Sequence, residues 1–86
     1  MYSNVQTPAQ LSTHLKSLRK AHKLTQAQLG ALIGVKQTRM ADIEKNPGAV
    51  NVAQLLQVLH ALDTRLLLAS SEQASRIAAP QGAADW

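Results

Sequence analysis

The chain lacks cysteine and phenylalanine, and its two aromatic residues, Tyr2 and Trp86, stand near opposite ends of the sequence. Without cysteine it has no disulfide, thiolate metal site or thiol nucleophile. No apolar run approaches the roughly 20 residues that cross a bilayer. The first ten residues also lack the basic start and apolar stretch of a secretory signal. These absences predict a cytoplasmic protein.

Residue patterns typical of enzymes are missing too. The three histidines, His14, His22 and His60, are spread along the chain without a paired carboxylate or any cysteine, and they do not show the close ligand spacing of a zinc site. No glycine-rich phosphate loop is present. The sequence therefore predicts a protein that is not an enzyme and that uses no metal or cofactor, with the histidines on exposed helix surfaces.

What remains is a small, aliphatic and basic chain. Its 86 residues suffice for one small domain with a modest core, and the 45% hydrophobic content is almost all aliphatic, which fits a compact helical domain. Residues 1–45 hold seven basic residues against two acidic ones, whereas residues 46–86 hold two against three. Such a charge distribution favours nucleic acid only weakly, because solvated helix faces are also rich in lysine.

Local signals predict four helices, at about 8–21, 26–33, from near Lys36 to Lys45, and 52–62. Helix starts are indicated by Thr7-Pro8, by Thr25 with Gln28 in a capping-box pattern, and by Asn51. Helix ends are indicated by Gly34 and by Asn46-Pro47-Gly48. The apolar spacing predicts inward faces made of Leu11, Leu15, Leu18, Ala21, Leu29, Leu32, Ile33, Met40, Ile43, Val52, Leu55, Leu56, Leu59 and Leu62, with Val58 at the side.

After the fourth helix, residues 65–69 are predicted to form a short strand. A single strand cannot satisfy its own backbone groups, and no second strand is evident in the chain. We therefore expect the strand to pair with its copy across a two-fold axis, through Arg65, Leu66, Leu67, Leu68 and Ala69. The predicted division is a folded domain that includes this dimerisation strand, at 1–69, and a flexible tail at 70–86.

The second and third predicted helices meet the requirements of a helix-turn-helix. With Gln26 as the first residue, the motif needs five apolar interior residues, which are Leu29, Ile33, Val35, Met40 and Ile43. It also needs a tiny residue at Gly30, where the helices approach, and a turn residue at Gly34. A glycine inside a helix costs about 1 kcal/mol relative to alanine, so Gly30 makes sense only as a close-contact position.

The stretch TQAQLGALIGVKQTRMADIEKNPG resembles the Cro/C1-type (Xre-like) helix-turn-helix family, and the surrounding helices extend that likeness over about 8–62. The chain departs from the family pattern at Gly30, where alanine is usual, at Met40, where a branched aliphatic is usual, and at Ala41, where serine is usual. None of these departures disrupts the fold. The resemblance implies an all-α domain of four to five helices that binds DNA.

In such a domain the start of the third helix enters the major groove. The predicted base contacts are Lys36, Gln37, Thr38 and Ala41. The predicted phosphate contacts are Gln26, which would bind together with backbone N–H groups at the start of the second helix, and Arg39, Lys45 and Arg19. Each of the three cations could equally be ordinary solvated surface. Asp42 could accept from cytosine, but a structural role, as a cap or in a pair with Lys45, is favoured.

A closer resemblance, over the whole chain, is to HipB-type antitoxins. It rests on Thr7-Pro8-Ala9-Gln10-Leu11, on GVKQ, on the E-x-N-P stop, on the short strand and on a tail ending in Asp85-Trp86. It implies a homodimer with an intersubunit sheet, binding to a palindromic operator, repression of its own operon and capture of a HipA-like serine/threonine kinase toxin.

In this interpretation Asp85 and Trp86 anchor the tail on the toxin or mark it for degradation. An accidental tryptophan at a frayed end is the alternative. Two other functions stay open. One is a stand-alone Xre-like repressor without a toxin, and the other is a protein-interaction module that does not bind DNA.

Overall fold

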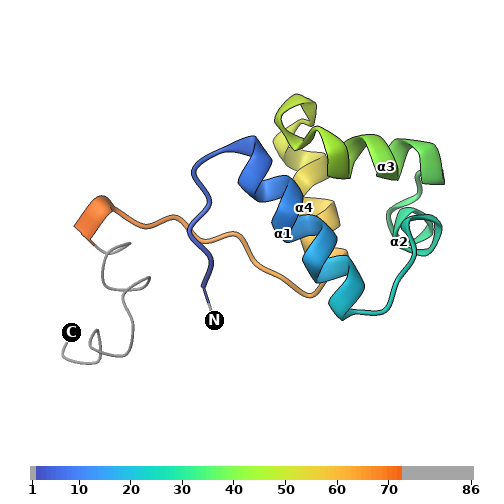
Figure 1. Cartoon of the computed structure of the whole chain (residues 1–86), viewed down its shortest axis with the longest axis horizontal. Coiled ribbons are helices and arrows are strands. Elements are labelled where there is room, and N and C mark those ends of the chain that lie inside the picture. Colours follow the sequence, from blue (N-terminus) through green and yellow to red (C-terminus); the bar gives the residue numbers. More distant parts are fainter. Residues whose placement is uncertain (1, 73–86) are drawn as a thin grey trace.

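The computed structural model describes residues 2–72, whose complete elements are four helices and one short 3-10 turn (Figure 1). The elements are α1 (Pro8–Ala21), α2 (Gln26–Ile33), α3 (Gln37–Lys45), η1 (Pro47–Ala49) and α4 (Val52–Ala61). The predicted all-α class is confirmed, and α3 and α4 each differ from expectation by one residue at one end. No helix within residues 2–72 has the length and apolar character needed to cross a membrane.

Side-chain caps fix where three of the helices begin. Thr25 accepts a hydrogen bond from the Gln28 N–H at 3.0 Å, and the Gln28 side chain accepts from the Thr25 N–H at 2.8 Å. Thr7 and Gln10 form the same reciprocal pair at the start of α1. Asn51 accepts from the Gln54 N–H at 2.8 Å. The predicted caps are confirmed, and each is typically worth about 1 kcal/mol.

The turn between α2 and α3 depends on two glycines. Gly34 has φ +78°, the left-handed conformation predicted for the end of α2. A Cβ at Gly30 would lie only 2.7 Å from the backbone oxygen of Val35 and 3.5 Å from the Cβ of Met40. Gly30 is thus a close-contact position as predicted, although the turn backbone approaches it more closely than α3 does.

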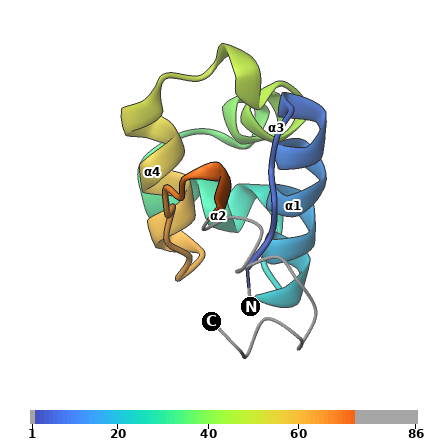
Figure 2. The ribbon, with the colours of Figure 1, turned by 90° about the vertical axis from the view of Figure 1, so that its left-hand side faces the viewer.

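The core lies where the helices meet, with α1 and α4 on opposite sides of the molecule and α2 and α3 linking them (Figure 2). Leu15 of α1 belongs to the same buried cluster as side chains of the other three helices. The buried hydrophobic residues are Leu15, Leu29, Met40, Ile43, Val58, Leu59 and Leu62. Six of the seven belong to the predicted inward faces, and Val58, predicted at the side, is fully buried.

The expected inward faces were wrong at four positions, because Leu32, Val52, Leu56 and Ala21 are exposed. On α4 the buried face follows Leu55, Val58, Leu59 and Leu62, so Leu56 faces outward and Val52 lies beyond the core at the helix start. Periodicity finds the direction of an apolar face but not how far the core extends.

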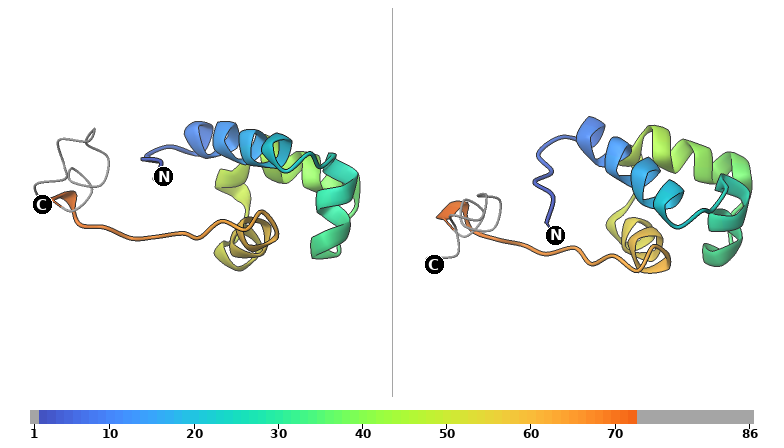
Figure 3. Two further views of the ribbon diagram at one scale, coloured as in Figure 1. Left: turned by 90° about the horizontal axis from the view of Figure 1, so that it is seen from below. Right: turned by 60° about the horizontal axis from the view of Figure 1, so that its bottom comes forward.

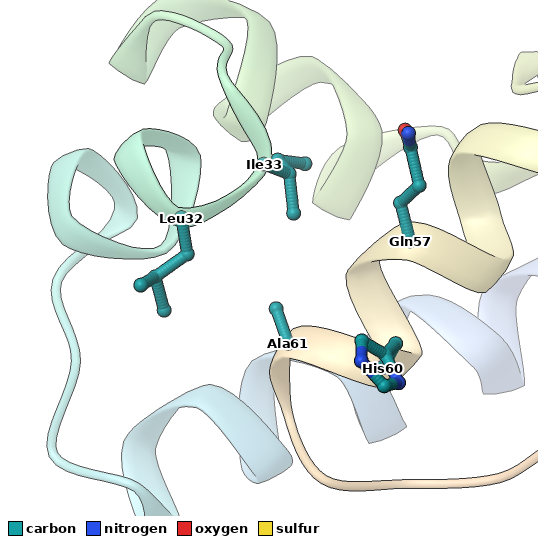
Figure 4. A pocket seen from close by; sticks show the side chains of 5 residues that line it. All are labelled: Leu32, Ile33, Gln57, His60 and Ala61. Atoms are coloured by element: carbon teal, nitrogen blue, oxygen red, sulfur yellow. The ribbon is translucent and has the colours of Figure 1, made fainter.

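Leu32 stands at a shallow open hollow between α2 and α4, lined also by Ile33, Gln57, His60 and Ala61 (Figure 4). Its side chain is 62% exposed. The residues that α4 contributes to the lining are the small Ala61 and the polar Gln57 and His60. Leu32 therefore lacks the apolar partners that would bury it.

The segment after α4 leaves the helices in a non-helical, extended course (Figure 3). Residues 65–69 carry no strand assignment in this single chain, and all five are exposed. The intersubunit strand therefore stays a prediction. Ser71 and Glu72 are helical, which differs from the irregular chain expected from residue 70. Asp85 and Trp86 lie outside the described residues.

Candidate nucleic-acid interface

The start of α3 is an exposed edge held in place by buried residues further along the helix. Lys36 caps α3 with an extended backbone (φ −76°, ψ 161°), and the helix begins at Gln37, one residue later than expected. Met40 and Ile43 are fully buried and fix α3 against the core. As a result Lys36, Gln37 and Thr38 point away from the core, whereas Ala41 is half-buried.

Two predicted site residues from different helices meet at this edge. The Nε2 of Gln37, at the start of α3, donates to the Oε1 of Gln26, at the start of α2, over 2.7 Å. Sequence reasoning assigned Gln37 to a base and Gln26 to a phosphate without linking them. The hydrogen bond joins the first residues of both helices of the motif into one unit.

Behind this pair lies a glutamate that sequence reasoning did not single out. The Nε2 of Gln26 donates to the Oε1 of Glu44 at 3.2 Å, and the Nε of Arg19 donates to the Oε2 of Glu44 at 2.6 Å. Glu44 is fully buried and the Arg19 side chain is 14% exposed. Glu44 follows Met40 by four residues and Ile43 by one, so its place on the inward face of α3 was readable from the helical spacing.

Further bonds tie Arg19 and Glu44 to the backbone. Arg19 also donates from Nη1 to the carbonyl of Leu24 at 2.9 Å, just before α2. The Ser12 hydroxyl of α1 donates to the backbone carbonyl of Glu44. No buried side-chain nitrogen or oxygen among the described residues lacks a hydrogen-bond partner. Arg19, which the sequence placed among the phosphate contacts, thus has its guanidinium committed to joining α1 to α3 and to the segment before α2.

Two other predicted phosphate contacts lie on the outside of α3. The Nη2 of Arg39 donates to the Oε1 of Gln54 on α4 at 2.9 Å, and this pair is exposed. Lys45 is exposed in the last turn of α3, where a cation is favoured by the helix dipole. Asp42 makes no ion pair with Lys45 and no side-chain hydrogen bond within residues 2–72, so neither form of the structural role expected from the sequence, a cap or a pair with Lys45, is present.

The histidines and acids of the described chain do not gather into a metal site. Across residues 2–72, no group of three or more histidine, aspartate or glutamate side chains is placed to hold a metal ion. The polar groups that do converge are amides, one carboxylate and one guanidinium at the α2–α3 edge. Of these groups the Gln37 amide is exposed, and it is suited to hydrogen-bonded recognition.

Comparison with known proteins points to one family. The helix-turn-helix family matches residues 15–68, which is more than half of the chain. Antitoxin HipB of Escherichia coli strain CFT073 is 28% identical over 85 residues, which span 99% of this chain and 90% of the relative. Antitoxin HipB of Escherichia coli K12 is 26% identical over 85 residues, which span 99% of this chain and 97% of the relative.

Solved structures give the same answer. The "HipB-O1-O2 complex" superposes with a TM-score of 0.73 at 26% identity, over 80% of this chain and 100% of that one. The HipB chain in the "Structure of HipA-HipB-O2-O3 complex" gives a TM-score of 0.74 at 26% identity, over 81% of this chain and 99% of that one. The resemblance to HipB-type antitoxins is thereby confirmed.

Proposed function

The chain belongs to the helix-turn-helix family, and on this premise we propose that it is a DNA-binding antitoxin that reads a palindromic operator as a homodimer and represses its own operon. The observation that carries the proposal is the exposed start of α3, where Gln37 is held by Gln26 above a buried ion pair. A side chain that reads bases must be exposed and yet fixed in direction. Gln37 meets both conditions.

The residue types at this edge match the chemistry of the major groove. A glutamine amide donates and accepts side by side, and so pairs with the N7 and N6 groups of adenine. The Lys36 ammonium can donate to the O6 and N7 acceptors of guanine, and the Thr38 methyl can contact thymine. Ala41, one turn further along, lies half-buried at the edge of the same surface.

Phosphate contacts complete the proposed interface. Gln26 begins α2, whose free backbone N–H groups and positive dipole end favour an anion. Arg39 and Lys45 add exposed positive charge on α3. Arg19 is better assigned to the internal ion pair with Glu44, because its side chain is only 14% exposed.

The homodimer is supported by unburied apolar surface at the end of the described chain. Three consecutive leucines lie in the segment after α4, and they stay exposed. Leu66, Leu67 and Leu68 are 52%, 56% and 93% exposed. Exposed apolar surface of this kind marks interaction sites. We propose that residues 65–69 pair with the same strand of a second copy, which would place two reading helices on one duplex.

A HipA-like toxin is the proposed protein partner. Support comes from the structure of a HipA-HipB-O2-O3 complex, in which the HipB chain shares this fold. Asp85 and Trp86 stay the proposed contact of the tail, because a tryptophan buries a large area in a partner pocket.

The test of DNA reading is the double variant Lys36→Ala, Gln37→Ala. Binding-site selection from a random duplex library would define the preferred sequence of the unaltered protein. The variant should bind that sequence no better than scrambled DNA, because each base contact contributes about 1–3 kcal/mol of discrimination. Fluorescence anisotropy measures both affinities, and circular dichroism checks that the helices remain.

The matched control is Gln57→Ala on α4, which should bind like the unaltered protein because Gln57 lies outside the proposed interface. The affinity of the unaltered protein should also fall steeply with salt, because phosphate contacts release counterions. Unchanged selectivity of the double variant would contradict base reading by α3. A flat salt response would favour a protein-interaction module instead.

A further inference from the structure

The hydrogen bonds behind the start of α3 form a chain in one direction. Arg19 donates to Glu44, Gln26 donates to Glu44, and Gln37 donates to Gln26. An ionised carboxylate only accepts hydrogen bonds, whereas a glutamine amide can turn and offer either its oxygen or its nitrogen. The fixed member of this chain is therefore Glu44, and the two glutamines must adjust to it.

The adjustment determines how each amide is turned. Because Glu44 presents an oxygen, Gln26 must turn its Nε2 inward, and its Oε1 is then left to face Gln37. Gln37 must answer with its own Nε2. The second N–H of that nitrogen and the Oε1 of Gln37 stay available on the outer side, where the amide offers one donor beside one acceptor.

We propose that Glu44 is a positioning residue that sets, through Gln26, which way the Gln37 amide faces the major groove. This inference rests on the proposed function. The orientation it imposes matches adenine, whose N7 accepts and whose N6 donates, and not guanine, whose N7 and O6 both accept. A residue that does not touch DNA thereby selects the base. Because the Gln37 amide is already oriented in the free protein, orienting it costs no further conformational freedom on binding.

The substitution Glu44→Gln should reverse the chain. The new amide must turn its oxygen to Arg19, which only donates, and so presents its nitrogen to Gln26. Gln26 then turns its oxygen inward and its nitrogen toward Gln37. Gln37 answers with its oxygen, so its two N–H donors face the groove. The preferred base at the position read by Gln37 should change from adenine toward guanine.

A second variant, Gln26→Met, breaks the chain and leaves the Arg19–Glu44 ion pair in place, so it covers the case in which Glu44→Gln does not fold. The Gln37 amide can then turn freely. The ratio of affinities for adenine and guanine at its position should fall by about five- to 150-fold, the range given by one bidentate contact. Gln57→Met is the matched control and should leave the ratio unchanged.

The experiment selects sites from a random duplex library with each folded full-length variant, then measures affinities on duplexes that differ at one base pair. The Gln37→Ala variant first identifies the base pair that Gln37 reads, which is the position where this variant loses the base preference of the unaltered protein. If Gln37→Ala changes no position, the proposed base reading itself is wrong and this inference falls with it.

Suppose instead that Gln37→Ala removes the preference. Positioning by Glu44 is then supported if Gln26→Met lowers the ratio of the affinities for adenine and guanine at that base pair. It is supported further if Glu44→Gln shifts the preference from adenine to guanine. A uniform loss of affinity by Gln26→Met with the ratio intact would show that Gln26 only binds phosphate and would overturn the proposal. A folded Glu44→Gln protein that still prefers adenine would overturn it too.

Discussion

At the scale of single residues, the least expected feature is the fully buried charge of Glu44 in a small domain. Taking a carboxylate and a guanidinium out of water is costly, and their attraction offsets that cost only with good geometry and further hydrogen bonds. Both conditions hold, because Glu44 also accepts from Gln26 and Arg19 also donates to Leu24. The pair therefore joins three helices at one point.

Breaking this pair from one side should be severe. Arg19→Met keeps the aliphatic bulk but leaves Glu44 buried without its cation, and we expect the free energy of unfolding to fall by about 3–5 kcal/mol. Replacing both members, as in Arg19→Met with Glu44→Leu, should recover much of that loss because no unpaired charge remains. Urea denaturation followed by circular dichroism measures both. A single variant as stable as the unaltered protein would disprove a stabilising pair.

At the scale of helices, capping chemistry made most boundaries predictable. Thr25 with Gln28 and Gly34 bracketed α2, because side-chain caps and a left-handed glycine act within a few residues. Other features require residues distant in sequence. The link from Arg19 through Glu44 to Gln26 appears only when three helices meet, so sequence alone supplied Gln26 and Gln37 without the carboxylate that orients them.

The ends of α1 and α4 carry a second kind of signal, a left-handed residue after the helix, which the sequence does not mark with glycine. Each ends with a non-glycine residue at positive φ, Lys23 at 58° and Asp63 at 52°. After α1, Lys23 N–H donates to the Lys20 carbonyl and Leu24 N–H to the Arg19 carbonyl, the two bonds of a Schellman motif. In most Schellman motifs the left-handed position is a glycine, and neither helix end has one there.

Glycine at the end of α1 should accordingly stabilise the domain. Lys23→Gly removes the steric cost of the left-handed conformation, roughly 1–2 kcal/mol, and loses part of the gain to the greater freedom of glycine in the unfolded chain. We expect the free energy of unfolding to rise by about 0.5–1 kcal/mol, measured by urea titration. The control Lys20→Gly, inside α1, should lower it by about 1 kcal/mol. Equal losses in both variants would refute this account of the cap.

At the scale of the whole molecule, the described chain is a folded body with one proposed DNA-reading edge and an apolar segment that its own helices do not cover. The buried core ends at Leu62, yet three leucines follow within six residues. A single helix-turn-helix reads only a few base pairs, and a two-fold dimer doubles the contact. A second copy of the chain would cover the exposed leucines and would also double the number of base pairs that are contacted.

Backbone pairing between copies can be tested at Leu67, in the middle of the predicted strand. Leu67→Pro removes an N–H donor from the ladder and should raise the dimer dissociation constant, measured by sedimentation equilibrium. Operator affinity should fall with it, because each half-site would then bind one copy alone. The helices should persist by circular dichroism, since residues 65–69 are all exposed in the single chain. Leu67→Val keeps the N–H and should stay dimeric. A Leu67→Pro protein that dimerises as tightly as the unaltered one would place the interface elsewhere, with the exposed Val52 and Leu56 on α4 as the next surface to alter.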